Sequence, residues 1–139
     1  MILLDTSGLL AALDASQRLH AACRAALDAA SGPLLLSPFV LAELDYLLMR
    51  NVGPHAQAAL LDEVVRGAYR LESFATEDIE RAAALMRRYG DLAIGLADAS
   101  IVVLAERHAT TDILTLDRRH FEALRAGGRK RFRIVPADG

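Results

Sequence analysis

Residues 2–8 read Ile-Leu-Leu-Asp-Thr-Ser-Gly, which is three aliphatic residues followed by an acid and a turn-forming triplet. Such an apolar run is typical of a short strand that is buried on both faces of a parallel sheet. Residues 113–117, Ile-Leu-Thr-Leu-Asp, repeat the pattern of an apolar strand that closes on an aspartate. Because ligands bind beyond the carboxyl ends of the strands in open α/β sheets, the two stretches predict Asp5 and Asp117 at one binding edge.

The rest of the chain alternates short apolar runs with segments of helical periodicity, separated by glycine and proline. Ser37 before Pro38 has the form of a helix N-cap and first helical position, and Thr76 is the expected cap of a later helix. This alternation predicts an α/β fold, with a mainly parallel sheet of four to five short strands and helices on both faces. Strands are expected at about 2–5, 34–36, 69–74, 112–116 and 132–135, and helices at about 8–13, 16–30, 38–50, 55–67, 76–89, 96–108 and 119–126.

The length and composition are those of one ordinary domain spanning residues 1–139. A hydrophobic fraction of 53% allows a real core, but no run approaches the ~20 apolar residues of a membrane span, and no signal peptide is recognised. Cys23 is the only cysteine, so an internal disulfide is excluded and a cytoplasmic location is expected.

Charge is unevenly distributed along the chain, although the net charge of −2 gives the whole molecule no general affinity for nucleic acid. Residues 118–133 hold seven basic residues against one acidic residue, a balance of +6 that leaves −8 for the remainder. A basic end on an acidic body is expected of a protein that holds a phosphate backbone near an acidic site. A solvated tail explains the same pattern equally well.

Two further acids, Glu43 and Asp98, lie among apolar residues of predicted helices. Most of the four acids have an ordinary explanation when taken singly, since Asp98 suits a helix dipole, Asp5 suits a turn and Asp117 suits a helix cap. Their joint occurrence is harder to dismiss, because an ionised carboxylate in an apolar setting is usually paired or bound to a metal.

Four carboxylates in one pocket would repel one another strongly. Two such groups ~5 Å apart repel by about 3 kcal/mol at an effective dielectric of 20, whereas the whole stability of a domain is about 5–15 kcal/mol. A bound cation relieves this repulsion, and all-oxygen ligands select Mg²⁺ or Mn²⁺ over Zn²⁺. Such an ion polarises a phosphate and orients an attacking water, so the sequence predicts hydrolysis of a phosphodiester.

Four segments of the chain resemble the motifs of PIN-domain ribonucleases, and most of all those of the VapC-type toxins of bacterial toxin–antitoxin pairs. They are MILLDTSGLL, SPFVLAEL, DLAIGLADASIVVLAER and ILTLDRRHF, which span the chain in the family's order. The resemblance implies a three-layer PIN-like fold and endonucleolytic cleavage of RNA with Mg²⁺ or Mn²⁺. It also implies a cognate antitoxin and a homodimer.

The same resemblance implies that Asp5, Glu43, Asp98 and Asp117 are the acidic residues of the metal site. Asp5 and Asp98 are expected to bind the metal directly. Glu43 and Asp117 are expected to bind the same metal, to bind a second one or to position water.

Residues near these acids are expected to support the site. Arg118 and Arg119 are expected to hold RNA phosphates, and His120 is interpreted as part of a solvated helix start. Three hydroxyl residues are expected to hydrogen-bond the carboxylates or a metal-bound water, with turn and strand packing as the alternative. They are Thr6, Ser7 and Thr115.

Other classes of function fit the residues less well. A phospho-acceptor receiver domain would need paired acids after the first strand and a late lysine, but Thr6 follows Asp5 and the only lysine, Lys130, lies in the basic end. A phosphatase with an aspartate nucleophile would need a second acid at position 7, which is serine. A housekeeping RNA-processing nuclease and a catalytically silent PIN-like domain that binds RNA or protein stay open as alternatives.

Overall fold

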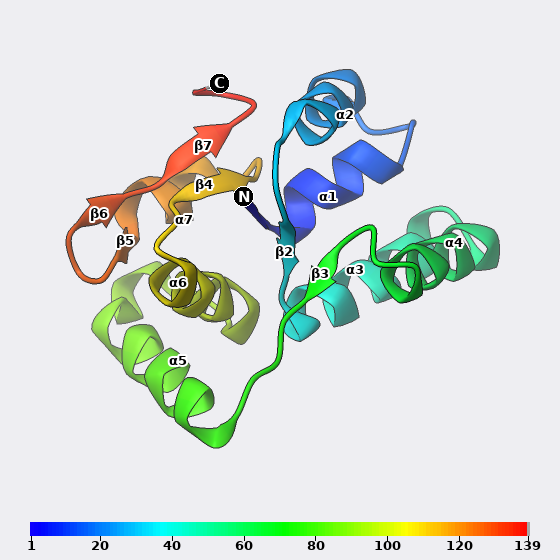
Figure 1. Ribbon diagram of the computed structural model, residues 1–139. Coiled ribbons are helices and arrows are strands. Elements are labelled where there is room, and N and C mark those ends of the chain that lie inside the picture. The colour runs from blue at the N-terminus through cyan, green and yellow to red at the C-terminus, as the bar shows by residue number, and fades with distance from the viewer. Residues whose placement is uncertain (139) are drawn as a thin grey trace.

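Five short parallel strands form the central sheet, in the order β3-β2-β1-β4-β7 (Figure 1). The computed structural model describes residues 1–138. Leu3 of β1 pairs with Leu35 of β2 on one side and with Ile113 of β4 on the other, so β1 is the middle strand. The predicted α/β class, with a mainly parallel sheet of four to five strands, is confirmed. The strands of the sheet are β1 (Ile2–Leu4), β2 (Leu34–Leu36), β3 (Arg70–Leu71), β4 (Asp112–Leu114) and β7 (Arg133–Val135).

Helices cover both faces of the sheet. α2 contacts β4, whereas α6 contacts β1 and packs against α5, and Figure 1 shows α2 and the α5–α6 pair on opposite sides of the sheet. Within residues 1–138, no helix is long and apolar enough to cross a membrane. The helices are α1 (Thr6–Leu13), α2 (His20–Ala29), α3 (Pro38–Asn51), α4 (Pro54–Val65), α5 (Thr76–Arg88), the 3-10 helix η1 (Gly90–Leu92), α6 (Leu96–His108) and α7 (Arg118–Ala123).

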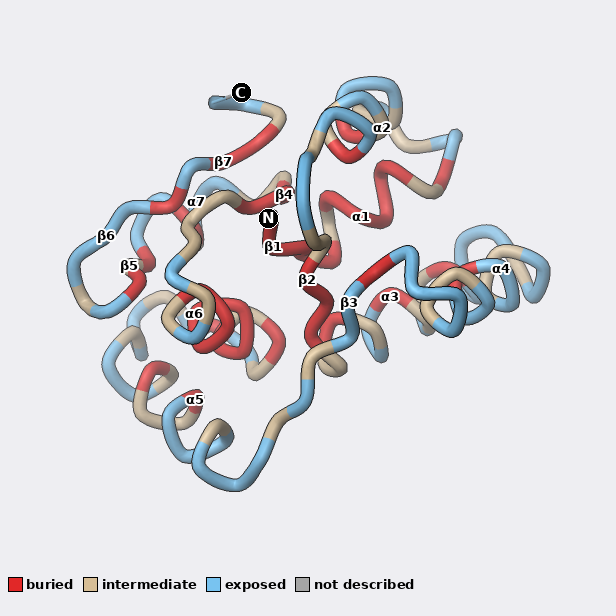
Figure 2. The backbone as a smooth tube through the Cα atoms, in the orientation of Figure 1, coloured by how far each residue is buried: buried red, intermediate tan, exposed pale blue. Residues whose placement is uncertain are grey.

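The core lies in the sheet and in the helices packed on it, and Figure 2 shows the buried segments of β1, β4 and α6. α1 begins so close to β4 that a Cβ atom on Gly8 would lie 2.6 Å from the carbonyl oxygen of Leu114. Glycine alone therefore permits this contact. The contact sets Asp5 and Ser7 beside the end of β4, where the candidate site lies.

Two helices begin at other residues than the sequence predicts. α1 starts at Thr6 without a preceding turn, because Asp5 occupies the N-cap position in an extended conformation (φ −97°, ψ 153°) and leads the strand directly into the helix. α2 starts at His20 and not near residue 16. The delay follows from the Asp14 carboxylate, which accepts hydrogen bonds from the backbone and the side chain of Ser16 and holds a turn there.

The two predicted helix caps have different outcomes. Ser37 is the N-cap of α3, and its hydroxyl accepts a hydrogen bond from the backbone of Phe39 at 3.1 Å, as predicted. The prediction for Thr76 is wrong, because Ala75 is the N-cap of α5 and Thr76 is the first helical residue. Asp78 takes over the capping role, since its carboxylate accepts from the backbone N–H of Ala75 at 2.8 Å.

The C-terminal quarter differs most from the predicted elements. The last helix, expected at 119–126, ends at Ala123. Outside this quarter, the strand expected at 69–74 is also shorter, with only the two residues of β3. β5 (Arg125–Ala126) and β6 (Lys130–Arg131) form an antiparallel ribbon that the sequence did not predict. Gly127 and Gly128 have φ values of 58° and 75°, a conformation that favours glycine and allows the tight connection.

Candidate metal centre

Three aspartates from separate elements gather at the carboxyl edge of the sheet. Asp5 directly follows β1, Asp117 follows the end of β4, and Asp98 lies in the first turn of α6. One carboxylate oxygen of Asp98 lies within 4.8 Å of one from Asp117. The backbone N–H of Asp5 donates to the carbonyl of Leu114 at 3.0 Å, which extends the β1–β4 pairing to the acid itself.

Two hydroxyl groups hold the carboxylate of Asp5. Ser7 Oγ donates to Asp5 Oδ2 at 2.9 Å, and Thr115 Oγ1 donates to the same oxygen at 2.6 Å. The hydroxyl oxygens also accept backbone N–H groups, Ser7 from Leu116 and Thr115 from Asp117, both at 2.9 Å. The two hydroxyls also lie 3.2 Å from each other, so the network joins Asp5 to the loop that carries Asp117 and fixes the orientation of the carboxylate relative to it.

Burial makes the charge of Asp5 unfavourable, because the residue is only 5% exposed. Burial raises the pKa of Asp5 to about 6, hydrogen bonds from Thr115 and Ser7 oppose the rise, and repulsion from Asp98 adds to it. The hydroxyls satisfy the carboxylate as an acceptor but bring no positive charge. Within residues 1–138, no basic side chain forms an ion pair with Asp5.

Glu43 reaches the same region from α3. Thr6 Oγ1 donates to Glu43 Oε1 at 2.7 Å, which links α3 to the first residue of α1. Burial raises the pKa of Asp98, and repulsion from Asp117 and Glu43 adds to the rise. The fourth acid is therefore close enough to Asp98 to interact with it, although Glu43 itself is exposed and lies at the open rim of the site.

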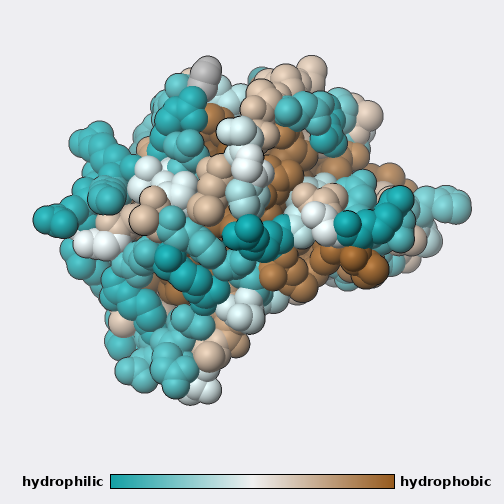
Figure 3. All heavy atoms as spheres, viewed as in Figure 1, coloured by the Kyte–Doolittle hydropathy of each residue, from teal (hydrophilic) through white to brown (hydrophobic). Residues whose placement is uncertain are grey.

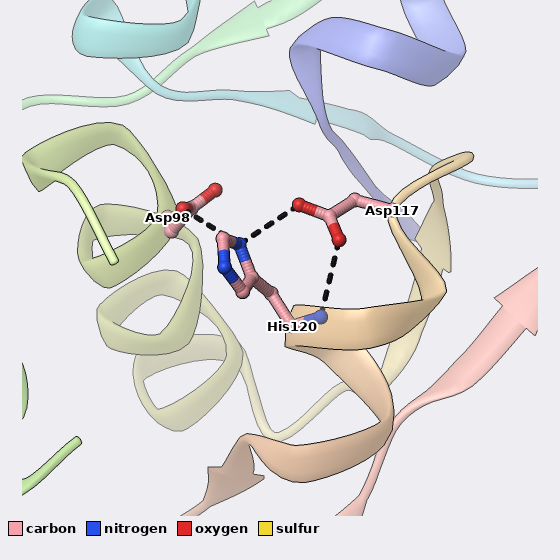
Figure 4. Close-up of side chains that lie close together, drawn as sticks. All are labelled: Asp98, Asp117 and His120. Atoms are coloured by element: carbon pink, nitrogen blue, oxygen red, sulfur yellow. Dashed lines mark hydrogen bonds and ion pairs between the residues drawn. The ribbon is translucent and has the colours of Figure 1, made fainter. Parts of the chain in front are cut away.

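His120 lies between two of the acids, as Figure 4 shows. Its Nδ1 is 2.9 Å from Asp117 Oδ2 and 3.4 Å from Asp98 Oδ2. Nδ1 is buried and makes no hydrogen bond, although Asp117 Oδ2 lies within ion-pair distance of it. The backbone N–H of His120 does donate to Asp117 Oδ1, at 3.1 Å, so Asp117 caps α7.

The position of His120 differs from the solvated helix start that the sequence favoured. Its side chain is only 19% exposed and turns back over the N-terminus of α7. Part of this position is visible in the sequence. Asp117 is the N-cap of α7 and His120 is the third residue of the helix, which lies beside the cap. The second acid of the cluster, Asp98, comes from another element and leaves no such signal in the sequence.

The two arginines beside Asp117 lie at the exposed start of α7. Arg118 pairs with Glu122 at 2.7 Å along the helix, whereas Arg119 is exposed and is not among the ion-paired residues of the described chain. Further along the basic segment, Arg133 approaches Asp112 at 3.6 Å. Part of the positive charge is therefore paired with surface acids, and part is free to meet an external anion.

The residues present fit a divalent cation. The cluster combines carboxylates whose pKa values are raised by burial, namely those of Asp5 and Asp98, with a buried nitrogen of His120 that has no hydrogen bond. Asp98, Asp117 and His120 each offer one atom, and the three atoms lie within 4.8 Å of one another. A cation would neutralise the carboxylates and give the buried nitrogen a partner.

Comparisons with known proteins agree with this geometry. The model of the PIN domain family matches residues 2–126. The ribonuclease VapC26 of Mycobacterium tuberculosis is 47% identical over 135 residues, which are 97% of this chain and 100% of that protein.

Two solved structures share the fold. The sarcin-ricin loop cleaving toxin VapC20 of Mycobacterium tuberculosis has a TM-score of 0.79 and 21% identity over 84% of this chain and 90% of its own. A toxin–antitoxin complex from Klebsiella pneumoniae has a TM-score of 0.67 and 20% identity over 89% of this chain and 92% of its own. The family model and the 47% identical relative each span most of the chain, so the protein belongs to the PIN domain family, as its motifs predicted.

Proposed function

We propose that the protein is a metal-dependent endoribonuclease that hydrolyses RNA phosphodiesters and acts as the toxin of a type II toxin–antitoxin pair. The observation that carries the proposal is the buried carboxylate of Asp5, which two hydroxyls hold near other acids and with which no basic side chain of residues 1–138 forms an ion pair. The 47% identity to a ribonuclease over the whole length of that relative supports the substrate class. Residues 1–139 act as one nuclease domain.

The side chains have separable roles in this proposal. A divalent ion, when bound, supplies a Lewis acid that polarises a phosphate oxygen and acidifies a water. Asp5 and Asp98 bind the ion, and the hydroxyls of Ser7 and Thr115 keep Asp5 in the orientation that binding needs. Asp117 contributes a further carboxylate.

Glu43 has a different position from the aspartates. It lies at the exposed rim, where a hydrogen bond from Thr6 fixes its Oε1. This placement suits a residue that orients the attacking water. Attack of water on phosphorus with departure of the 3′ oxygen leaves a 5′-phosphate and a 3′-hydroxyl. Mg²⁺ is the expected ion on its affinity for oxygen ligands, with Mn²⁺ as the second candidate.

Cleavage of RNA is expected to require a divalent ion. Excess chelator should abolish it, and added Mg²⁺ or Mn²⁺ should restore it, because the carboxylates alone offer no Lewis acid. The measurement is gel analysis of a labelled RNA, with mapping of the product ends to 5′-phosphate and 3′-hydroxyl.

The matched variant for this experiment is Asp98→Asn, which keeps the size of the side chain and removes its charge. It should lower turnover by at least ~100-fold with the fold intact. The melting temperature of the metal-free variant should be at or above that of wild type, because the substitution relieves repulsion among the acids. Cleavage that persists in chelator, or products with 2′,3′-cyclic phosphate ends, would rule out the proposed hydrolysis.

Asp5→Asn is expected to change how stability depends on pH in the metal-free protein. The folded chain holds the Asp5 proton up to a pKa of about 6, against 3.8 for a free aspartate, so the folded state binds more protons between these values. The free energy of unfolding of wild type should therefore fall as the pH rises through this window, by about 3 kcal/mol.

The asparagine variant lacks that titration, so near pH 7 it should exceed wild type in stability and near pH 4 the two should converge. Urea denaturation in chelator at a series of pH values measures the difference. Asp62→Asn, which removes an exposed carboxylate of α4, serves as the control and should follow wild type. Parallel pH profiles for wild type and Asp5→Asn would contradict the expectation.

The basic segment is expected to hold RNA without taking part in the chemistry. Replacing both Arg118 and Arg119 by alanine should weaken RNA binding and flatten its salt dependence, by roughly 0.7–0.9 in the slope for each phosphate that the variant no longer neutralises. Arg119→Ala should have the larger single effect, because Arg118 is already paired with Glu122.

Arg66→Ala is the matched control, since Arg66, the residue that caps the C-terminus of α4, forms the same kind of pair with Asp62 one helical turn away. Binding and its salt dependence are measured by fluorescence anisotropy at several salt concentrations. An unchanged slope in the double variant would mean that these arginines only pair with surface acids.

The protein is expected to work in the cytoplasm with a cognate antitoxin and as a homodimer built partly from apolar helix faces. Several apolar side chains of the α3–α4 pair are exposed, including Tyr46 at 63% and Val65 at 85%. Figure 3 shows hydrophobic side chains towards α3 and α4 and a hydrophilic surface over α5. Exposed apolar area of this kind is usual where another protein binds.

Co-expression with the product of a neighbouring small gene should give a complex that no longer cleaves RNA. Wild type alone should sediment as a dimer, and Tyr46→Asp with Val65→Asp should shift it towards the monomer, because buried charge opposes the contact. Ile79→Asp, on exposed α5, is the control. If no neighbouring product binds and expression is harmless to the host, the housekeeping nuclease becomes the better interpretation.

A further inference from the structure

The imidazole of His120 has one nitrogen with a clear role and one without. Nε2 lies 3.1 Å from the backbone carbonyl of Leu92. A carbonyl oxygen only accepts, so Nε2 carries the hydrogen of this bond. In the neutral ring the lone pair is then on Nδ1, the buried nitrogen that makes no hydrogen bond and lies among carboxylates.

A charged imidazole that bridges the two aspartates is the alternative explanation of this cluster. A protonated Nδ1 would direct its hydrogen at a carboxylate oxygen, and Asp117 Oδ2 is within reach at 2.9 Å. Nδ1 nevertheless makes no hydrogen bond. A cation bound between the carboxylates would give this buried nitrogen the partner that it lacks.

Two ligand atoms of one cation also lie close together without a hydrogen bond between them. Around an octahedral ion with bonds of ~2.1 Å, neighbouring ligand atoms are ~3 Å apart, and each points at the metal and not at its neighbour. Nδ1 is 2.9 Å from Asp117 Oδ2 and 3.4 Å from Asp98 Oδ2. Both separations are close to this spacing, and Figure 4 shows the ring directed between the two carboxylates.

The contact to Leu92 is a further, independent indication. A histidine that binds a metal almost always donates its other N–H to a carboxylate, a carbonyl or water, which fixes the tautomer and the ring orientation. η1 presents the Leu92 carbonyl to Nε2 in this manner. The two other partly buried histidines make similar contacts, His20 Nδ1 with the Ala11 carbonyl and His108 Nε2 with Glu72. What sets His120 apart among the described residues is that its other nitrogen lies between two aspartates.

We infer that His120 Nδ1 is a ligand of the catalytic ion, together with a carboxylate oxygen from each of Asp98 and Asp117. The inference rests on the proposed function and adds a nitrogen to a site that the four acids alone would make all-oxygen. Imidazole suits first-row transition metals, whereas Mg²⁺ takes oxygen ligands. The ratio of Mn²⁺ affinity to Mg²⁺ affinity should therefore be higher in this protein than in a site made of four carboxylates alone.

Pulsed electron paramagnetic resonance of the full chain loaded with Mn²⁺, in the absence of RNA, tests the ligand directly. Wild type should show ¹⁴N modulation of the Mn²⁺ echo, and protein labelled with ¹⁵N in histidine should show ¹⁵N modulation in its place. This comparison changes no residue, so it does not depend on a variant that folds.

His120→Gln then identifies which of the four histidines is responsible. This variant should lose the nitrogen modulation. Its Mn²⁺ affinity should fall by at least ~10-fold, the loss that is usual when even a residue that only orients a metal ligand is replaced. Its Mg²⁺ affinity should fall by less. The preference for Mn²⁺ over Mg²⁺, measured by competition titration, should fall accordingly. His55→Gln, at an exposed position of α4, should keep both the modulation and the preference.

The two levels of the proposal fail in different ways. Metal-dependent cleavage by a protein whose Mn²⁺ shows no histidine nitrogen would overturn the role of His120 and leave the nuclease intact. Modulation that survives in His120→Gln would also overturn it. Cleavage that needs no metal, in a protein that binds no Mn²⁺, would remove the proposed mechanism along with the ligand.

Discussion

Asp5 ends the central strand with a carboxylate that is buried and hydrogen-bonded but not neutralised, and this combination governs the architecture around it. The strand pairing continues to the backbone of Asp5, Gly8 lies in close contact with the carbonyl of Leu114, and the Asp5 residue is only 5% exposed. The hydroxyls of Ser7 and Thr115 fix its position. Because they add no charge, the folded chain keeps an unfavourable electrostatic term that only protonation or a cation removes.

The group formed by Asp98, Asp117 and His120 has a different environment from Asp5. Asp98 and Asp117 come from elements on either side of the opening, and His120 lies between them. Their carboxylates are more accessible than that of Asp5, with side-chain exposures of 19% and 31%. Asp5 therefore gives the site a rigid floor, whereas the Asp98–Asp117–His120 group gives it a face that solvent and substrate can reach.

The sequence predicted those parts of the fold that depend on local patterns. The apolar strands, each closing on an acid, gave the parallel sheet and the edge at which Asp5 and Asp117 lie, and Ser37 before Pro38 marked a helix start. It missed the β5–β6 ribbon, because two-residue strands have no periodicity to detect and two adjacent glycines also suit a loop.

His120 shows the other limit of sequence reasoning. Its nearness to Asp117 is local and was visible, but its contacts with Asp98 and Leu92 join residues that are 22 and 28 positions away. Nothing in the local pattern distinguishes a histidine in the first turn of a solvated helix from one that turns back into a cluster of acids. Only the packing of α6 and η1 against α7 decides between the two.

α7 carries both acidic and basic residues of the proposed site. Its N-cap is the acid Asp117, its first two residues are the arginines at positions 118 and 119, and its third is His120. The backbone N–H of His120 donates to Asp117 Oδ1, so the cap of this helix is itself one of the acids. If Arg119 holds a phosphate, as proposed, that phosphate lies about half a turn of helix from Asp117. The short element, and not the longer helices of the core, would then set the register between an RNA backbone and the proposed metal site.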